Sequence, residues 1–143
     1  HMLAPLATVF GGFMLKEVND ELGLTRYVID AVLPFMTPGL FPVIVFLTMG
    51  FLGFATASFW GLFVIAFPII IPLATAVDAN MPLVLGAMLS ASGFGSHACF
   101  YSDATVLAAK GSGCTPIAHA FTQFPYALMA AGVAAIGFLL AGF

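Results

Sequence analysis

Hydrophobic residues follow one another along this chain in long stretches that charged residues do not interrupt. No Asp, Glu, Lys or Arg occurs in residues 31–77 or in residues 111–143. Most of the charged residues lie instead between residues 16 and 30, which we expect to form the main polar loop. Uncharged apolar runs of about 18 residues or more are typical of membrane-spanning helices. The pattern therefore predicts an all-α integral membrane protein.

Small and polar residues divide the first apolar run into two predicted helices. These cover residues 43–54 and 62–77 and are separated by the sequence ATASFWG. Both are short, because a bilayer core of about 30 Å needs roughly 20 helical residues. We expect them to be the two arms of a re-entrant hairpin over about residues 40–77, with its tip at residues 55–60. Two full spans joined by a tight turn are the alternative.

The second half of the chain contains a helix that is interrupted by polar and small residues. The interrupting sequence is SGFGSHACFYSDATVLAAKGSG, residues 92–113. We predict a discontinuous transmembrane helix over about residues 82–110, unwound over residues 93–103, and a last span over about residues 117–143. Residues 1–143 together are expected to form a single membrane domain.

The interruption has the residue types of a binding site. Irregular backbone at membrane depth is tolerated only inside protein or beside a wet cavity. Gly93 and Gly95 are expected to adopt dihedral angles that a helix does not use. A broken helix leaves carbonyl groups free at one end and N–H groups free at the other. Oxygen atoms are the ligands of hard cations such as sodium, and free N–H groups suit a carboxylate.

Asp103 is the strongest candidate for a functional residue in this segment. An ionisable residue within a membrane span is a candidate functional residue by default, although an aspartate also makes a good cap for the helix that follows. Ser102 and Thr105 add hydroxyl oxygens beside it. We therefore predict that Asp103, Ser102 and Thr105 bind sodium.

Other polar residues are expected to complete the site. His97 is a candidate proton carrier, because histidine as a residue type can change its charge near neutral pH, or it is a histidine hydrogen-bonded within the helix bundle. Polar residues at the hairpin tip are placed to face the break from the opposite side. The full set predicted to bind the ion or substrate is Thr56, Ser58, Gly93, Gly95, Ser96, His97, Ser102, Asp103 and Thr105.

Composition excludes several classes of function. The chain is 62% hydrophobic and 6% charged, with a mean hydropathy of +1.16, whereas soluble domains carry about 25% charged residues. It has no basic patch to bind nucleic acid. Its two cysteines have neither metal-binding nor redox spacing. It contains no nucleophile–base pair or phosphate-binding loop at useful spacing, so we expect neither an enzyme nor an organic cofactor.

Three segments resemble the C-terminal half of the NhaC-type sodium/proton antiporters, a family within a wider ion-transporter superfamily. FATASFWGLFVIAFPIIIPLA resembles the family's hairpin, SGFGSHACFYSDATVLAAKGSGC its unwound segment, and HAFTQFPYAL the start of its last helix. The resemblance covers roughly residues 10–143. It implies two inverted repeats, each with a re-entrant hairpin and a broken helix, and sodium as the coupling ion. The site residues it implies are Thr56, Ser58, Ser102, Asp103 and Thr105.

The chain departs from the family pattern at two places. Ser96 stands where the family usually has an acidic residue or Asn, and Cys99-Phe100-Tyr101-Ser102 replaces Ser-Pro-Ile-Ser. Losing an acidic residue weakens the case for proton antiport, and aromatic residues in the break suit a pocket for an organic molecule. The main prediction is sodium/proton antiport. The alternatives are a sodium-coupled carrier of an amino acid or small organic acid, and a non-transporting half subunit that scaffolds a partner chain.

By this resemblance the chain corresponds to one repeat of a two-repeat transporter, and one repeat alone cannot close a site. Three arrangements supply the second repeat: a homodimer with antiparallel copies, a separate chain carrying the N-terminal half, or a longer protein of which this is a fragment. We expect a self-standing half that associates. Its expected location is the bacterial inner membrane, as a multi-pass protein in contact with lipid.

Overall fold

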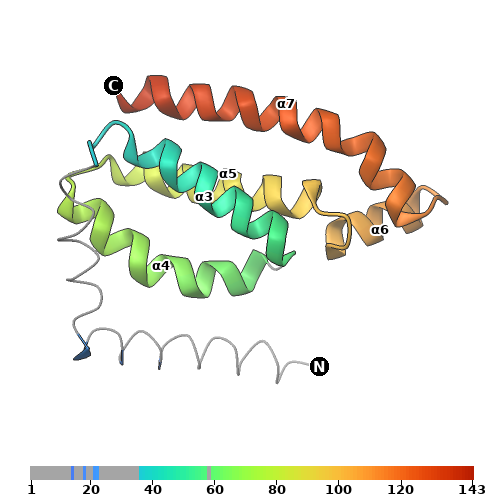
Figure 1. Ribbon diagram of the computed structural model, residues 1–143, viewed down its shortest axis with the longest axis horizontal. Helices are drawn as coiled ribbons and strands as arrows, with labels where there is room; N and C mark the ends of the chain where they lie inside the picture. The colour runs from blue at the N-terminus through green and yellow to red at the C-terminus, as the bar shows by residue number, and fades with distance from the viewer. Residues whose placement is uncertain (1–13, 15–17, 19–20, 23–35, 58) are drawn as a thin grey trace.

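The computed structural model describes residues 14, 18, 21, 22, 36–57 and 59–143. These residues form helices and connecting turns, and none of them belongs to a β-strand. The helices are α3 (Phe41–Thr56), α4 (Phe59–Ala76), α5 (Met81–Ala98), α6 (Asp103–Gly111) and α7 (Pro116–Gly142) (Figure 1). The all-α prediction is confirmed for this part of the chain.

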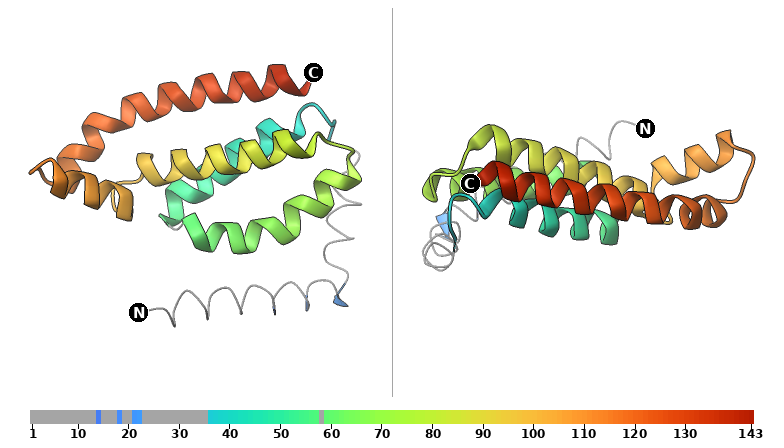
Figure 2. Two further views of the ribbon diagram at one scale, coloured as in Figure 1. Left: turned by 180° about the vertical axis from the view of Figure 1, so that it is seen from behind. Right: turned by 90° about the horizontal axis from the view of Figure 1, so that it is seen from above.

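Helices α3 and α5 lie together in the middle of the structure. Figure 1 shows α7 along one side of this pair and α4 along the other, and Figure 2 shows the same arrangement from behind and from above. α3 and α5 run in one direction, whereas α4 and α7 run in the opposite one. α6 extends beyond the end of α5, at the same end of the molecule as the turn between α3 and α4. The predicted hairpin and the predicted broken helix therefore meet at one end of the bundle.

A turn at Ala57 separates α3 from α4. α3 carries Pro42 in its first turn, where a missing N–H is not needed. It ends where Ala57 adopts a left-handed conformation with φ 53°, and the Ala57 N–H donates to the Gly53 carbonyl at 3.0 Å. α4 begins at Phe59 and runs in the opposite direction. The turn thus lies within the sequence predicted to form the hairpin tip.

Polar caps fix the ends of the later helices. The Asn80 side chain accepts a hydrogen bond from the Leu83 N–H at 3.2 Å and starts α5. Ser102 caps α6 in the same way, and Thr115, followed by Pro116, caps α7. The axes of α5 and α6 differ by 53° across the intervening residues 99–102.

The break is shorter than the sequence predicts. Gly93 and Gly95 are helical and lie within α5, and Asp103 begins α6, so the predicted unwinding over residues 93–103 is wrong for residues 93–98 and for residue 103. The reason is that Gly95 serves a helix contact. A Cβ at Gly95 would lie 2.7 Å from the carbonyl carbon of Gly53 in α3. Small residues of this kind let two helix backbones approach closely.

The hydrophobic core lies between α3, α4 and α5, and α7 covers only one edge of it. Phe46 of α3, for example, is buried and its ring lies 5.3 Å from that of Phe138 in α7. The outer face of α7 is apolar and exposed, as Val133 at 72% and Leu140 at 73% show. Within the described residues, α7 is the one helix long and apolar enough to cross a membrane alone, and α5 and α6 meet that criterion together.

The contact between α3 and α5 can be tested with the two glycines of α5. We expect Gly95→Ala to reduce the free energy of unfolding by about 1–3 kcal/mol, because the added methyl group overlaps the backbone of α3. The control is Gly93→Ala, since a Cβ there has nothing within 4 Å. Alanine also favours helix over glycine by about 1 kcal/mol. Thermal unfolding in detergent, followed by circular dichroism, compares the two variants.

The expected result is a lower unfolding midpoint for Gly95→Ala and an unchanged or higher one for Gly93→Ala. Equal midpoints for the two variants would contradict the assignment of Gly95 to the helix contact.

Candidate functional site

Two buried hydroxyl groups close the break between α5 and α6. Ser102 and Thr105 are each 1% exposed. The Ser102 hydroxyl donates to the Ser96 carbonyl at 2.5 Å, and the Thr105 hydroxyl donates to the Cys99 carbonyl at 2.7 Å. These carbonyls lie at the end of α5, where no further helical N–H follows. The hydroxyl groups therefore satisfy the acceptors that the break leaves free.

The same groups bring four oxygen atoms together inside the protein. The hydroxyl oxygens of Ser102 and Thr105 are 3.0 Å apart, and Ser102 Oγ also accepts from the Thr105 N–H at 3.2 Å. With the carbonyl oxygens of Ser96 and Cys99, they form a cluster of neutral oxygen donors, which we call the hydroxyl cluster. Hard cations take such oxygens as ligands. A bound cation would take these oxygens as ligands once the hydroxyl hydrogens turn away from the carbonyls, with both hydroxyl groups still protonated.

The carboxylate of Asp103 lies beside this cluster in the chain but faces outward. Its side chain is exposed, and Oδ1 accepts a hydrogen bond from the Ala104 N–H at 2.8 Å. Ser102, not Asp103, is the cap of α6, so Asp103 occupies the first helical position. A negative charge there is favoured by the helix dipole. Of the three predicted sodium ligands, the structure thus joins Ser102 and Thr105 directly and leaves Asp103 at the edge.

Tyr101 joins the break to the hairpin tip. Its hydroxyl group donates to the Ala55 carbonyl in the last turn of α3, at 2.6 Å. Thr56, the predicted site residue next to it, is exposed and turns its hydroxyl back to the Leu52 carbonyl of its own helix at 2.8 Å. Ser58, the other predicted residue of the tip, lies outside the described residues. Among the described residues of the tip, Ala55 therefore meets the break through Tyr101, whereas the Thr56 hydroxyl bonds within its own helix.

Phe100 packs the break against aromatic rings of α3 and α7. Its ring lies 6.5 Å from that of Phe54 in α3, and 5.3 Å and 5.9 Å from those of Phe121 and Phe124 in α7. Aromatic pairs at such separations add stability beyond the area they bury. The ring thus packs between α3 and α7. Phe100, one of the two aromatic residues of the break, therefore packs against protein.

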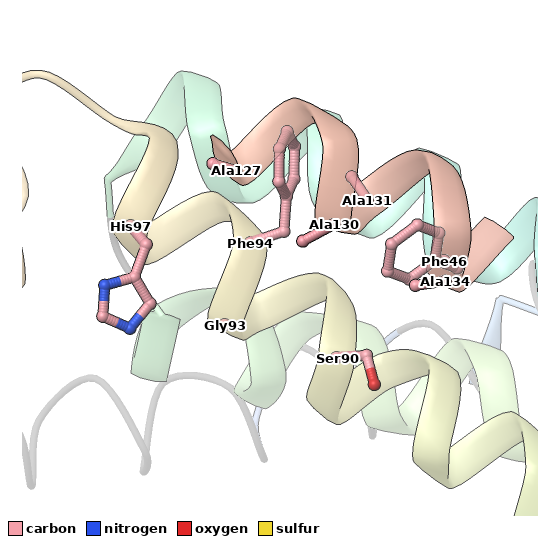
Figure 3. Close-up of a pocket in the computed structure, with 9 residues that line it drawn as sticks. All are labelled: Phe46, Ser90, Gly93, Phe94, His97, Ala127, Ala130, Ala131 and Ala134. Atoms are coloured by element: carbon pink, nitrogen blue, oxygen red, sulfur yellow. The ribbon is translucent and has the colours of Figure 1, made fainter. Parts of the chain in front are cut away.

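His97 is placed at a separate pocket between α3, α5 and α7. Its Nδ1 lies 3.3 Å from Nε2 of Gln123 in α7, and its side chain is exposed. The pocket has a volume of about 260 Å³ and is mostly apolar (Figure 3). Figure 3 shows Phe94 pointing toward a row of alanines on α7. Gly93 and His97 line this pocket. Neither residue supplies an oxygen to the hydroxyl cluster.

Sequence reasoning missed Tyr101 and Gln123 as members of the contact network. The replacement of Ser-Pro-Ile by Cys-Phe-Tyr marked the break as unusual, and this was the available signal for Tyr101. Its hydrogen-bond partner is a backbone carbonyl 46 residues away, and a pattern of side chains does not predict such a contact. Gln123 stands in the HAFTQFPY sequence, and its polar side chain in an apolar helix was the signal there.

The structural role of the hydroxyl cluster can be tested with Thr105→Val. Valine keeps the shape of the side chain but leaves the buried Cys99 carbonyl without its donor. We expect the free energy of unfolding to fall by about 1–3 kcal/mol. The control is Thr75→Val, because the exposed Thr75 hydroxyl donates to the Ile71 carbonyl of its own helix, and we expect a change within about 0.5 kcal/mol there. Equal effects of both substitutions on the unfolding midpoint would refute this role.

Comparison with known proteins gives one family and two relatives. The model of the Na+/H+ antiporter family matches residues 1–143. An uncharacterized protein of Haemophilus influenzae is 29% identical over 99% of this chain and 28% of its own length. The malate-2H(+)/Na(+)-lactate antiporter of Bacillus subtilis is 31% identical over 78% of this chain and 24% of its own length.

The chain spans about a quarter of the length of these curated relatives, 28% of one and 24% of the other. No solved structure matches it. The family model covers the hairpin, the break and the last helix alike, because it extends over residues 1–143. The chain therefore belongs to the Na+/H+ antiporter family, in agreement with the resemblance found in its sequence.

Proposed function

We propose that this chain forms part of a membrane transporter that exchanges sodium ions for protons, with its ion site at the break between α5 and α6. The observation that carries the proposal is the pair of buried hydroxyl oxygens of Ser102 and Thr105, 3.0 Å apart and each bonded to a carbonyl at the end of α5. Membership of the Na+/H+ antiporter family supports sodium coupling.

The electrostatics of the break favour a cation on the side of α5. A helix carries a partial negative charge at its C-terminal end, because its last carbonyl groups lack helical partners. The Ser96 and Cys99 carbonyls belong to that end. The beginning of α6 carries the opposite partial charge, and Asp103 places a carboxylate there. Asp103 thus offsets the charge of α6 and supplies the negative charge that a partly desolvated sodium ion needs.

Competition between the two cations then couples their movements. A proton on the Asp103 carboxylate removes the charge that holds sodium, and sodium beside it disfavours the proton. Because Asp103 is exposed in the structure, either cation reaches the carboxylate without unfolding α6. Ionisable residues in membrane transporters serve such exchange.

Sodium-coupled exchange of a small organic acid is a second candidate. The Bacillus subtilis relative is named a malate-2H(+)/Na(+)-lactate antiporter, which favours this candidate. A substrate carboxylate would be expected at the free N–H groups of a helix start. At the start of α6, however, the Ala104 N–H is bonded to Asp103 and the Thr105 N–H to Ser102. We therefore favour the proton as the ion exchanged at this position.

We further propose that the chain works as a multi-pass protein of the bacterial inner membrane, with a second repeat that closes the site. The exposed apolar face of α7 suits contact with lipid. The exposed side chains of Thr56, Tyr101 and Asp103 lie at the end of the bundle that a second repeat would cover. That repeat is a second copy in the opposite orientation, a separate N-terminal half, or another part of a longer protein.

The ion site can be tested with Asp103→Asn in proteoliposomes that contain a pH-sensitive dye. We expect an imposed sodium gradient to drive a pH change in the wild type and the rate to fall at least tenfold in the variant. Asparagine keeps an oxygen that accepts from the Ala104 N–H, so the fold of α6 is preserved while the charge is lost. Asp78→Asn is the matched control, because Asp78 is an exposed residue of a turn with φ 54°, a conformation that asparagine tolerates.

Full sodium-driven flux in Asp103→Asn would show that this carboxylate does not take part in ion transport. Sodium-driven uptake of lactate or malate without a pH change would favour the second candidate instead.

A further inference from the structure

We propose that Tyr101 is a positioning residue. The hydrogen bond from its hydroxyl group to the Ala55 carbonyl, which we call the latch, holds the break against the hairpin tip. It thereby keeps the hydroxyl cluster in the arrangement that binds sodium. The part of this inference that concerns sodium rests on the function proposed above. The latch itself does not, because it follows from contacts between described residues.

The latch satisfies a backbone group that the end of α3 leaves free. Ala55 lies in the last turn of α3, and the chain leaves the helix at Ala57, which has a left-handed conformation. The Ala55 carbonyl therefore lacks a following helical N–H. The Tyr101 hydroxyl donates to it at 2.6 Å, from a position 46 residues further along the chain. One hydrogen bond thus connects the last turn of α3 to the middle of the break.

The neighbours of Tyr101 hold the remaining sides of the break. Phe100 packs against rings of α3 and α7, the Cys99 carbonyl accepts from Thr105, and Ser102 donates to Ser96. The Tyr101 side chain differs from these because it is 64% exposed. Because most of this residue is open to solvent, we take the hydrogen bond to the Ala55 carbonyl as the contact that holds it at the hairpin tip.

This solvent-exposed hydrogen bond of Tyr101 opens more readily than the buried contacts around it. The net contribution of a hydrogen bond corresponds to a change of roughly two- to tenfold in the ratio of closed to open forms. Cys99, Ser102 and Thr105 are each 1% exposed while the latch is closed. Opening it lets the break move away from α3 and admits water and reagents to these residues. The latch therefore controls both access to the hydroxyl cluster and its geometry.

The buried thiol of Cys99 reports the opening directly. The exposed Cys114 is first replaced in the full chain by Cys114→Ser, which leaves Cys99 as the thiol to be modified. Modification by N-ethylmaleimide is followed by mass spectrometry in detergent. We expect Tyr101→Phe, which removes only the hydroxyl group, to raise the rate of Cys99 modification roughly two- to tenfold.

Tyr126→Phe is the matched control. Tyr126 lies on α7, is 70% exposed and has no hydrogen-bond partner among the described residues. Its loss of a hydroxyl group should leave the rate unchanged. An unchanged rate in Tyr101→Phe, or an equal increase in both variants, would overturn the latch.

Repeating the measurement in sodium and in potassium separates the latch from the ion site. We expect sodium to slow Cys99 modification, with a roughly two- to tenfold higher half-protecting concentration in Tyr101→Phe. Faster modification in Tyr101→Phe without any protection by sodium would sustain the latch and contradict the proposed ion site. Protection by sodium at the same concentration in both proteins would sustain the ion site and overturn the positioning role of Tyr101.

Discussion

The close contact between α3 and α5 at Gly53 and Gly95 is the constraint on which the rest of the structure depends. A Cβ at Gly95 would come within 2.7 Å of the α3 backbone, so the two helices approach as near as they do because no side chain stands between them. Where lipid surrounds a protein, such close packing replaces the hydrophobic force that drives helices together in water. The contact places Ala55, at the end of α3, beside Tyr101 in the break.

The C-terminal ends of α3 and α5, which carry carbonyl groups without helical partners, are thereby brought close together. Hydroxyl groups of the same chain donate hydrogen bonds to these carbonyls. Ser102 and Thr105 serve the end of α5, and Tyr101 serves the end of α3. Irregular backbone deep in a membrane protein needs such internal partners. The oxygens that satisfy the break are also the kind that bind sodium, so the proposed ion site uses the groups that stabilise the break. The proposed function follows from this shared use.

Much of this arrangement can be predicted from the sequence, because helix ends carry local signals. Proline, asparagine, serine and threonine mark the starts of α5, α6 and α7, and Ser102 and Thr105 stand out as polar residues in an apolar region. The extent of the break is predicted wrongly. A glycine permits both an unwound backbone and a close contact between two helices. For Gly95 the choice between these roles depends on the nearby backbone of Gly53, which the sequence does not reveal. The partner of Tyr101 is a backbone atom, which leaves no trace in the sequence.

The most direct test of the account is whether sodium binds at the hydroxyl cluster. Thermal unfolding of the purified chain in detergent, in sodium chloride and in potassium chloride at equal ionic strength, measures this without any transport. An ion that binds the folded state at 100 times its Kd stabilises it by about 2.7 kcal/mol. The account predicts a higher unfolding midpoint in sodium than in potassium for the wild type and no such difference for Ser102→Ala. Equal midpoints in the two salts for the wild type, or an undiminished sodium effect in Ser102→Ala, would contradict it.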